Sequence, residues 1–201
     1  MVQYNLRKLF EERLNNHKLI AAIKEPKSIE KAIKYKENIS AVILMTGNVL
    51  TVKEYVDVLQ KAGLPVILHV EKIGGLAVDD YGIEFIKKNV KPFAIVTTKS
   101  SIIKKAKSKG IFVIQRVFLI DTEVYNNLVD NIEHIQSDII EIMPSRAPDF
   151  LQRLIKVSPI PIITGGLLTN SHDAKEALAH GVSAVTTSNT DLWKSDIMDI
   201  N

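Results

Sequence analysis

The sequence predicts a single, compact (β/α)8 barrel of the TIM type, with one extra helix before the first strand. Short apolar runs alternate with helical patterns roughly every 25 residues, which is the pattern of a parallel sheet. Eight such runs occur, and each is almost continuously apolar, as in strands that are buried on both faces. Eight units indicate closure into a barrel, and an open doubly wound sheet is the alternative. No G-x-G-x-x-G motif follows the first run, which argues against a dinucleotide-binding sheet.

Length and composition favour one soluble globular domain over residues 1–201. The chain is 46% hydrophobic and 24% charged, with a net charge of +3. A TIM-type barrel usually needs about 250 residues, so the loops must be short and one outer helix reduced. We expect an N-terminal helix over residues 1–16 and the barrel over residues 19–193.

The first half of the chain opens with an amphipathic helix, which we expect to cover the barrel bottom or a partner. Apolar, β-branched runs then predict strands at residues 19–23, 41–45 and 65–70. Helices between them are predicted at residues 28–37 and 52–62, the second of which ends at Gly63. The connection from His69 to Val78 is long and rich in polar residues and glycine, as functional loops often are.

The second half repeats the same alternation. Strands are predicted at residues 93–97, 111–118, 138–142, 160–164 and 183–186. Helices are predicted at residues 79–89, 99–109, 122–135, 147–157 and 170–180. Their starts are marked by N-cap residues, for which the candidates are Asp79 or Asp80, Asp121 or Thr122, and Asn170 or Ser171. With only a stub of a last helix, we expect the N-terminal helix or a second copy of the chain to cover exposed strand surface.

Two turns near the C-terminus predict a phosphate site. Gly165 and Gly166 follow the seventh strand and leave their backbone N–H groups accessible. Thr187, Ser188 and Asn189 follow the eighth strand and supply hydroxyl and amide donors. The loops after the last two strands of such barrels often bind phosphate, although a glycine turn beside a polar cap without a ligand is the simpler alternative.

A set of charged and polar residues follows other strands and should face the same rim of the barrel. Arg116 and Lys99 suit an anion, and Glu71 and Glu141 can bind the hydroxyl groups of a small polyol. The alternative is that Arg116 or Lys24 forms a buried ion pair with Glu141. The complete set is Lys24, Glu25, His69, Glu71, Lys72, Lys99, Arg116 and Glu141.

The helix after the fourth strand is strongly basic. Its five lysines, with no carboxylate among them, are Lys99, Lys104, Lys105, Lys107 and Lys109. Such a stripe can bind the phosphate backbone of RNA, and it is also common on solvated helix faces. No aromatic platform accompanies it, so base-specific reading is not visible.

The chain resembles the glycerol-3-phosphate-responsive antiterminator family from about Leu19 to Trp193. The segments that carry the resemblance are IAAIKEPK, HVE…GGLA, IVTTK, IQRVFLID, IIEIMP, PIITGGL and TTSNTDLW. It implies a barrel without a catalytic role that senses glycerol 3-phosphate and binds the leader of its target mRNA, preventing transcription termination. Under this resemblance Gly165, Gly166, Thr187, Ser188 and Asn189 would hold the phosphate. The polyol end would lie against Lys24, Glu71, Arg116 and Glu141.

The rival hypothesis is a barrel enzyme that acts on a sugar phosphate or glycerophosphodiester through Glu71 and Glu141. The early-strand His, Arg, Glu and Asp pattern of glycerophosphodiester hydrolases is not found, because this chain reads KEPK there. We expect no catalytic residues, no cofactor and no metal site. The lack of cysteine fits a cytoplasmic protein, and no apolar run reaches the roughly 18 residues of a membrane span. A homodimer and a protein partner in place of RNA both stay open.

Overall fold

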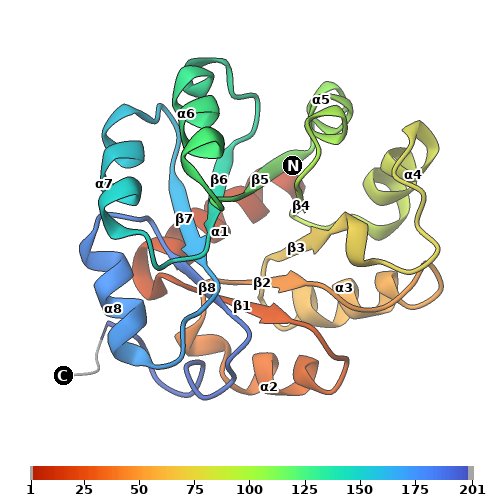
Figure 1. Ribbon diagram of the computed structural model, residues 1–201. Coiled ribbons are helices and arrows are strands. Elements are labelled where there is room, and N and C mark those ends of the chain that lie inside the picture. The colour runs from red at the N-terminus through yellow and green to blue at the C-terminus, as the bar shows by residue number, and fades with distance from the viewer. Residues whose placement is uncertain (1, 199–201) are drawn as a thin grey trace.

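The structure is a computed structural model that describes the backbone of residues 2–198 and the side chains of residues 6–198. Eight parallel strands form a closed barrel in sequence order, with β8 paired back to β1 (Figure 1). The predicted barrel is confirmed, and the open sheet is excluded. The strands are β1 Leu19–Ile23, β2 Ala41–Leu44, β3 Val66–His69, β4 Ala94–Thr97, β5 Phe112–Phe118, β6 Ile139–Met143, β7 Ile162–Gly165 and β8 Val185–Thr187.

The helices surround the barrel, apart from α1, which precedes it. They are α1 Val2–His17, α2 Ser28–Lys34, α3 Val52–Lys61, α4 Asp80–Phe85, α5 Ser100–Ser108, α6 Thr122–Asp130, α7 Pro148–Val157 and α8 Ser171–Ala179. Several are shorter than predicted, because their last turns tighten into 3-10 segments or widen into a π-helical one. Those segments are Lys36–Asn38, Ile132–His134 and Ile86–Val90, and a further 3-10 turn, Val70–Lys72, follows β3. Across residues 2–198, the helices are too short or too polar to span a lipid bilayer.

The helix starts were predicted as pairs of candidates, and the structure selects the first residue of each pair. The carboxylates of Asp79 and Asp121 accept hydrogen bonds from backbone N–H groups three residues later, both at 2.8 Å. The amide oxygen of Asn170 does the same at the start of α8, at 2.9 Å. These caps satisfy N–H groups that a helix leaves without partners.

Helix α1 covers the bottom of the barrel, at the amino ends of the strands. Phe10 is 1% exposed and stacks on Phe93 with their ring centroids 4.6 Å apart. The guanidinium of Arg13 donates to three carbonyl oxygens before β2, including that of Ile39 at 2.6 Å and that of Ser40 at 3.2 Å. Helix α1 was predicted to cover either the barrel bottom or a partner. In the structure it covers the barrel bottom.

The C-terminal segment, rather than α1, fills the place of the missing last helix. Leu192, Trp193 and Ile197 are all buried there. The indole N–H of Trp193 donates to the carbonyl oxygen of Thr187 at 3.2 Å, and the Asn38 amide donates to the carbonyl oxygen of Trp193 at 3.1 Å. Trp193 thus supports the end of β8 from behind. The expectation that α1 covers this surface is wrong, because three apolar residues of the C-terminal segment do so, and the expected homodimer stays a prediction.

Candidate ligand-binding site

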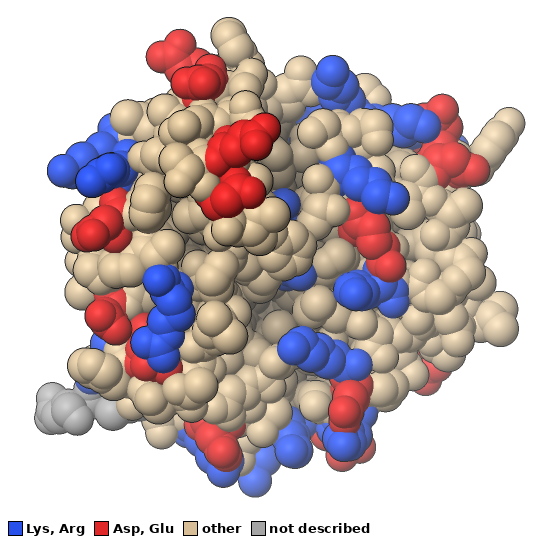
Figure 2. All heavy atoms as spheres, in the orientation of Figure 1, with Lys and Arg blue, Asp and Glu red and all other residues tan. Residues whose placement is uncertain are grey.

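A cavity of about 710 Å³ opens where the carboxyl ends of the strands meet. Figure 2 shows the molecule hollowed near the middle of this view, with basic side chains at its edge. The cavity brings together residues from both ends of the sequence. Its lining is Ala22, Lys24, Met45, His69, Glu71, Lys72, Thr98, Arg116, Phe118, Met143, Gly166, Leu167, Leu168, Thr186, Thr187, Ser188 and Asn189. Three of these carry a positive charge and one a carboxylate, so the lining favours an anion.

The two turns predicted to hold phosphate lie side by side on one wall. Gly166 has a φ of +78°, a conformation that favours glycine, and its carbonyl oxygen accepts from the Ser145 hydroxyl at 2.7 Å. Within residues 2–198, the backbone N–H groups of Gly166, Leu167 and Ser188 donate to no protein acceptor. Free N–H groups on adjacent turns are the arrangement that binds phosphate in many proteins.

Gly165 has a packing role and is not part of the lining. A Cβ atom at this position would come within 2.0 Å of the Thr186 Oγ1 and 2.7 Å of the Thr186 carbonyl oxygen. Only glycine therefore allows β7 to pack so closely on β8. The sequence placed both glycines at the site, whereas the structure puts Gly166 on the cavity wall and Gly165 directly beneath it.

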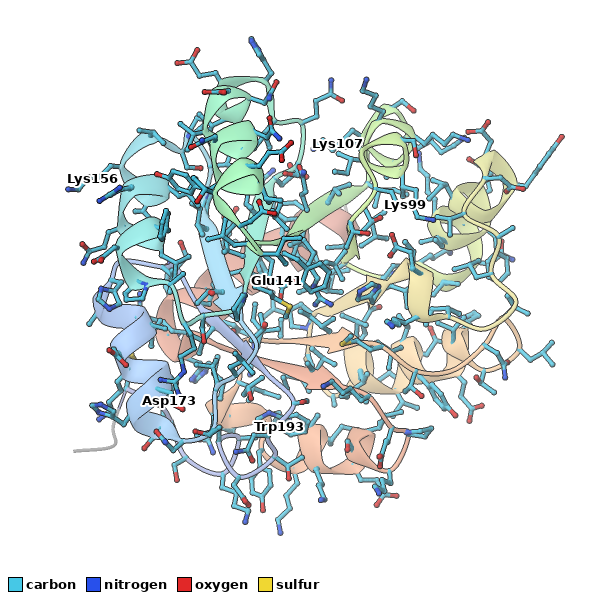
Figure 3. All side chains as sticks on the ribbon, in the orientation of Figure 1. Lys99, Lys107, Glu141, Lys156, Asp173 and Trp193 are labelled. Carbon is cyan, nitrogen blue, oxygen red and sulfur yellow. The ribbon has the colours of Figure 1, made fainter. Side chains whose placement is uncertain are left out.

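A set of hydrogen bonds that the sequence did not predict fixes the loop between β7 and α8. The Asp173 carboxylate accepts from the backbone N–H and the hydroxyl of Thr169, at 2.8 and 2.6 Å, and pairs with Arg146 at 2.8 Å. The bonds from Thr169, aided by Arg146, lower the pKa of Asp173 to about 2. The Asn189 amide donates to the Thr169 carbonyl oxygen at 3.0 Å, so the two turns are joined. Figure 3 labels Asp173 on α8.

Arg116 and Glu141 form a buried ion pair under the cavity. The Arg116 Nε lies 2.8 Å from Glu141 Oε2, and the side chains are 4% and 0% exposed. The Thr186 hydroxyl donates to the other oxygen, Oε1, at 2.7 Å. Both oxygens of Glu141 are thus engaged, and Glu141 lies inside the barrel instead of lining the cavity (Figure 3). Lys24 lines the cavity but forms no ion pair with Glu141, so of the two predicted pairs the structure contains the one with Arg116.

His69 and Glu71 form the opposite wall of the cavity. The His69 Nδ1 faces the Glu71 Oε2 at 3.1 Å, yet neither atom completes a well-aligned hydrogen bond to the described protein atoms. The Thr97 hydroxyl and the Thr98 N–H both donate to Glu71 Oε1. Burial alone would raise the pKa of Glu71, but His69 and Thr97 outweigh it and lower the pKa to about 2. A ligand hydroxyl can therefore meet buried polar atoms whose hydrogen bonding is incomplete.

The depressed pKa of Glu71 makes its contribution to stability dependent on pH. Because the folded-state pKa is about 2 and the ordinary value is 4.5, this contribution is complete above about pH 4.5 and is lost as the pH falls toward 2. We expect the wild type to lose about 1–2 kcal/mol more unfolding free energy than Glu71→Gln between pH 5 and pH 2.5, after allowance for partial exposure. Urea unfolding at several pH values measures this difference. An equal loss in both proteins contradicts it, and Glu30→Gln, at an exposed site on α2, should behave as the wild type.

The structure divides the five lysines of the basic helix into two groups. Lys105, Lys107 and Lys109 pair with the carboxylates of Asp80, Asp138 and Glu84 at 3.5, 2.7 and 3.1 Å. Lys99 and Lys104 are exposed and have no carboxylate partner within residues 6–198. The continuous basic stripe expected from the sequence is thus partly neutralised by neighbouring elements.

Further residues of the cavity escaped the sequence analysis, for reasons that differ. Thr98 belongs to the IVTTK segment, where two hydroxyl groups after a buried strand were a usable signal. Leu167 and Phe118 gave no signal, because apolar residues at a strand end resemble core. Among the described residues, no group of three or more His, Cys, Asp or Glu side chains comes close enough to hold a metal ion.

The closed sheet places the chain among the TIM-type barrels, in which ligand sites lie at the carboxyl ends of the strands, where this cavity opens. Residues 19–193 match the family described as glycerol-3-phosphate responsive antiterminator. The chain belongs to this family, as the sequence resemblance indicated, and the family consists of regulators rather than enzymes.

Two solved structures whose descriptions name glycerol uptake operon antiterminators are similar to this chain, and a curated relative matches most of its length. The glycerol uptake operon antiterminator regulatory protein of Listeria monocytogenes is 35% identical, with a TM-score of 0.82 over 89% of this chain and 96% of its own. A glycerol uptake operon antiterminator-related protein from Thermotoga maritima is 28% identical, with a TM-score of 0.77 over 89% and 98%. The uncharacterized Escherichia coli protein YgcP is 31% identical over 180 residues, 90% of this chain and 93% of its own.

Proposed function

We propose that the protein senses glycerol 3-phosphate in the cavity and, when occupied, binds the leader of a target mRNA and prevents premature transcription termination. The observation that carries the proposal is the convergence of Gly166 and Ser188 on one cavity whose far wall holds Glu71 and Arg116. Family membership supports the identity of the ligand. A phosphate and a polyol are then recognised by two different walls.

The phosphate lies against the two turns. The N–H groups of Gly166, Leu167 and Ser188 donate to its oxygens, and the Ser188 hydroxyl and Asn189 amide add further donors. The hydrogen bonds of Asp173 and Asn189 hold the turns in place before the ligand arrives. This preorganisation removes part of the ordering entropy that binding otherwise has to overcome.

The glycerol end lies against the opposite wall. The Glu71 carboxylate accepts from a ligand hydroxyl, and the guanidinium of Arg116 donates to one. Glu141 acts through Arg116, since both its oxygens are already bonded within the barrel. Lys24 adds positive charge at the rim. Glycerol alone can form hydrogen bonds to the wall with Glu71 and Arg116, and phosphate alone can form them to the two turns. Each of these molecules should therefore bind more weakly than glycerol 3-phosphate.

The experiment is to measure the affinity for the leader RNA of glycerol-use genes from the same organism, with and without saturating glycerol 3-phosphate. A ligand can shift the protein toward an RNA-binding form only through its different affinities for the two forms, and such coupling is typically 5- to 150-fold. We expect the RNA affinity to rise at least about tenfold with ligand. Glycerol and inorganic phosphate, tested separately, should produce little of this increase. Equal affinity with and without glycerol 3-phosphate overturns the proposal.

A further inference from the structure

A second hollow, outside the ligand cavity, lies between α5 and α6. It is a groove of about 560 Å³ whose floor is the outer face of β5. Gln115 and Val117 are half-buried there, whereas Ile95 of β4 and Ile140 of β6 are fully buried beneath their helices. Figure 1 shows α5 and α6 on adjacent sides of the barrel. The lining is Ser100, Ile103, Lys104, Gln115, Val117, Val124, Asn127, Leu128, Asn131, His134, Ile135 and Gln136.

The groove combines an apolar floor with side-chain amides. Gln115 is half-buried and Asn127 and Gln136 are exposed, and within residues 6–198 these three side-chain amides form no hydrogen bond to the protein. The lining contains no carboxylate, and its charged side chain is Lys104. Free amides present donors and acceptors together, as base edges do, while the apolar floor and the His134 ring can support base faces.

We propose that a single-stranded segment of the leader RNA docks in this α5–α6 groove, an inference that rests on the proposed function. The bases meet the amides of Gln115, Asn127 and Gln136, and the phosphate backbone follows Lys99 and Lys104. Lys105, Lys107 and Lys109 form ion pairs with carboxylates, so their charges are already compensated. Lys99 and Lys104 are therefore the two lysines of this segment that contact the RNA phosphates. Single strands fit this groove better than a duplex, because only unpaired bases expose their pairing edges.

The groove is joined to the ligand cavity by two short covalent and hydrogen-bonded routes. Glu71 accepts from the Thr97 hydroxyl and the Thr98 N–H, and α5 begins at Ser100, on the groove wall. On β5, Arg116 points into the barrel and lines the cavity, while its neighbours Gln115 and Val117 form the groove floor. Glu71 and Arg116 are therefore the residues through which a bound ligand can act on α5 and β5, which make up one side and the base of the groove.

The test uses two groove variants and two matched controls on the full chain, with RNA affinity measured at several salt concentrations. We expect Lys104→Gln to weaken RNA binding and to reduce the slope of log affinity against log salt by about 1, because one phosphate contact is lost. We expect Asn127→Ala to weaken binding about tenfold with the salt slope unchanged, because the lost contact is to a base. Both should keep the thermal stabilisation by glycerol 3-phosphate, which shows that fold and cavity are intact.

The controls lie on the same kinds of surface, away from the groove. Asn126 is exposed on α6 next to Asn127 in sequence, and Lys156 is exposed on α7 (Figure 3). Asn126→Ala and Lys156→Gln should bind RNA as the wild type does. If the groove variants also bind as the wild type does, the groove assignment is overturned while the antitermination proposal stands. If the wild type binds no RNA at any ligand concentration, the function proposal fails first and the groove assignment fails with it.

Discussion

Glu141→Gln should lower the unfolding free energy by about 3 kcal/mol or more, although the two side chains have nearly the same shape. The change leaves the Arg116 guanidinium, which is 4% exposed, without a counter-charge inside the barrel. In glutamine one of the two acceptor oxygens becomes an NH2 group. Either the Thr186 hydroxyl or the Arg116 guanidinium therefore loses its acceptor. For a domain of this size the melting temperature should fall by roughly 10 °C, which calorimetry measures directly.

Two further variants separate the buried charge from a general effect of losing a carboxylate. Glu84→Gln removes a carboxylate that is 34% exposed and paired with Lys88 and Lys109, and the variant should melt close to the wild-type temperature, because water screens such pairs. The double variant Arg116→Met/Glu141→Leu removes both charges and should regain much of the lost stability. A melting temperature for Glu141→Gln equal to that of the wild type would show that the pair does not hold the barrel interior together.

The fold was predictable because its signals are local and repeated. Most strands are short apolar runs, and helix starts such as Asp121 and Asn170 carry their own capping groups. The structure adds only which of two adjacent residues caps each helix and where last turns tighten. The C-terminal segment is the exception, because nothing local indicates that Trp193 folds back beneath β8.

The candidate site was predictable only as far as its residues follow strand ends. Gly166, Ser188, Glu71 and Arg116 were placed on one rim because parallel strands all end there, and the cavity contains them. The position of a residue along the sequence does not show whether its side chain lines the cavity at the rim or lies deeper, inside the barrel. Glu141 is that case, because its register opposite Arg116 on β5 sets it inside the barrel.

The net charge on the α5 surface could not be predicted from the sequence for a different reason. Their partners Asp80, Asp138 and Glu84 lie on α4 and before β6, so the neutralisation arises from contacts between separate β/α units. Charge counted along one helix therefore overstates the charge that RNA would meet. The α5–α6 groove is likewise a property of two helices and a strand, and its amides are scattered between Gln115 and Gln136 in the sequence.

Ser188→Asp should abolish most of the binding of glycerol 3-phosphate while leaving the fold unchanged. Ser188 is exposed on the cavity wall, so the new carboxylate can be solvated in the free protein. When the ligand binds, that carboxylate faces a phosphate dianion. Two like charges about 4 Å apart repel by about 4 kcal/mol at the effective dielectric near a protein surface. We therefore expect an affinity loss of at least about 100-fold, measured by calorimetric titration.

The matched control is Ser195→Asp, which adds the same charge to an exposed serine of the C-terminal segment outside the cavity lining. It should bind glycerol 3-phosphate with wild-type affinity, and both variants should unfold at the wild-type temperature in the absence of ligand. The two variants share net charge, so any difference between them reports on position alone. If Ser188→Asp binds the ligand as tightly as Ser195→Asp does, the phosphate does not lie between Gly166 and Ser188. The ligand anion would then have to bind to other cations of the cavity lining, of which Lys24 and Lys72 have no carboxylate partner within residues 6–198.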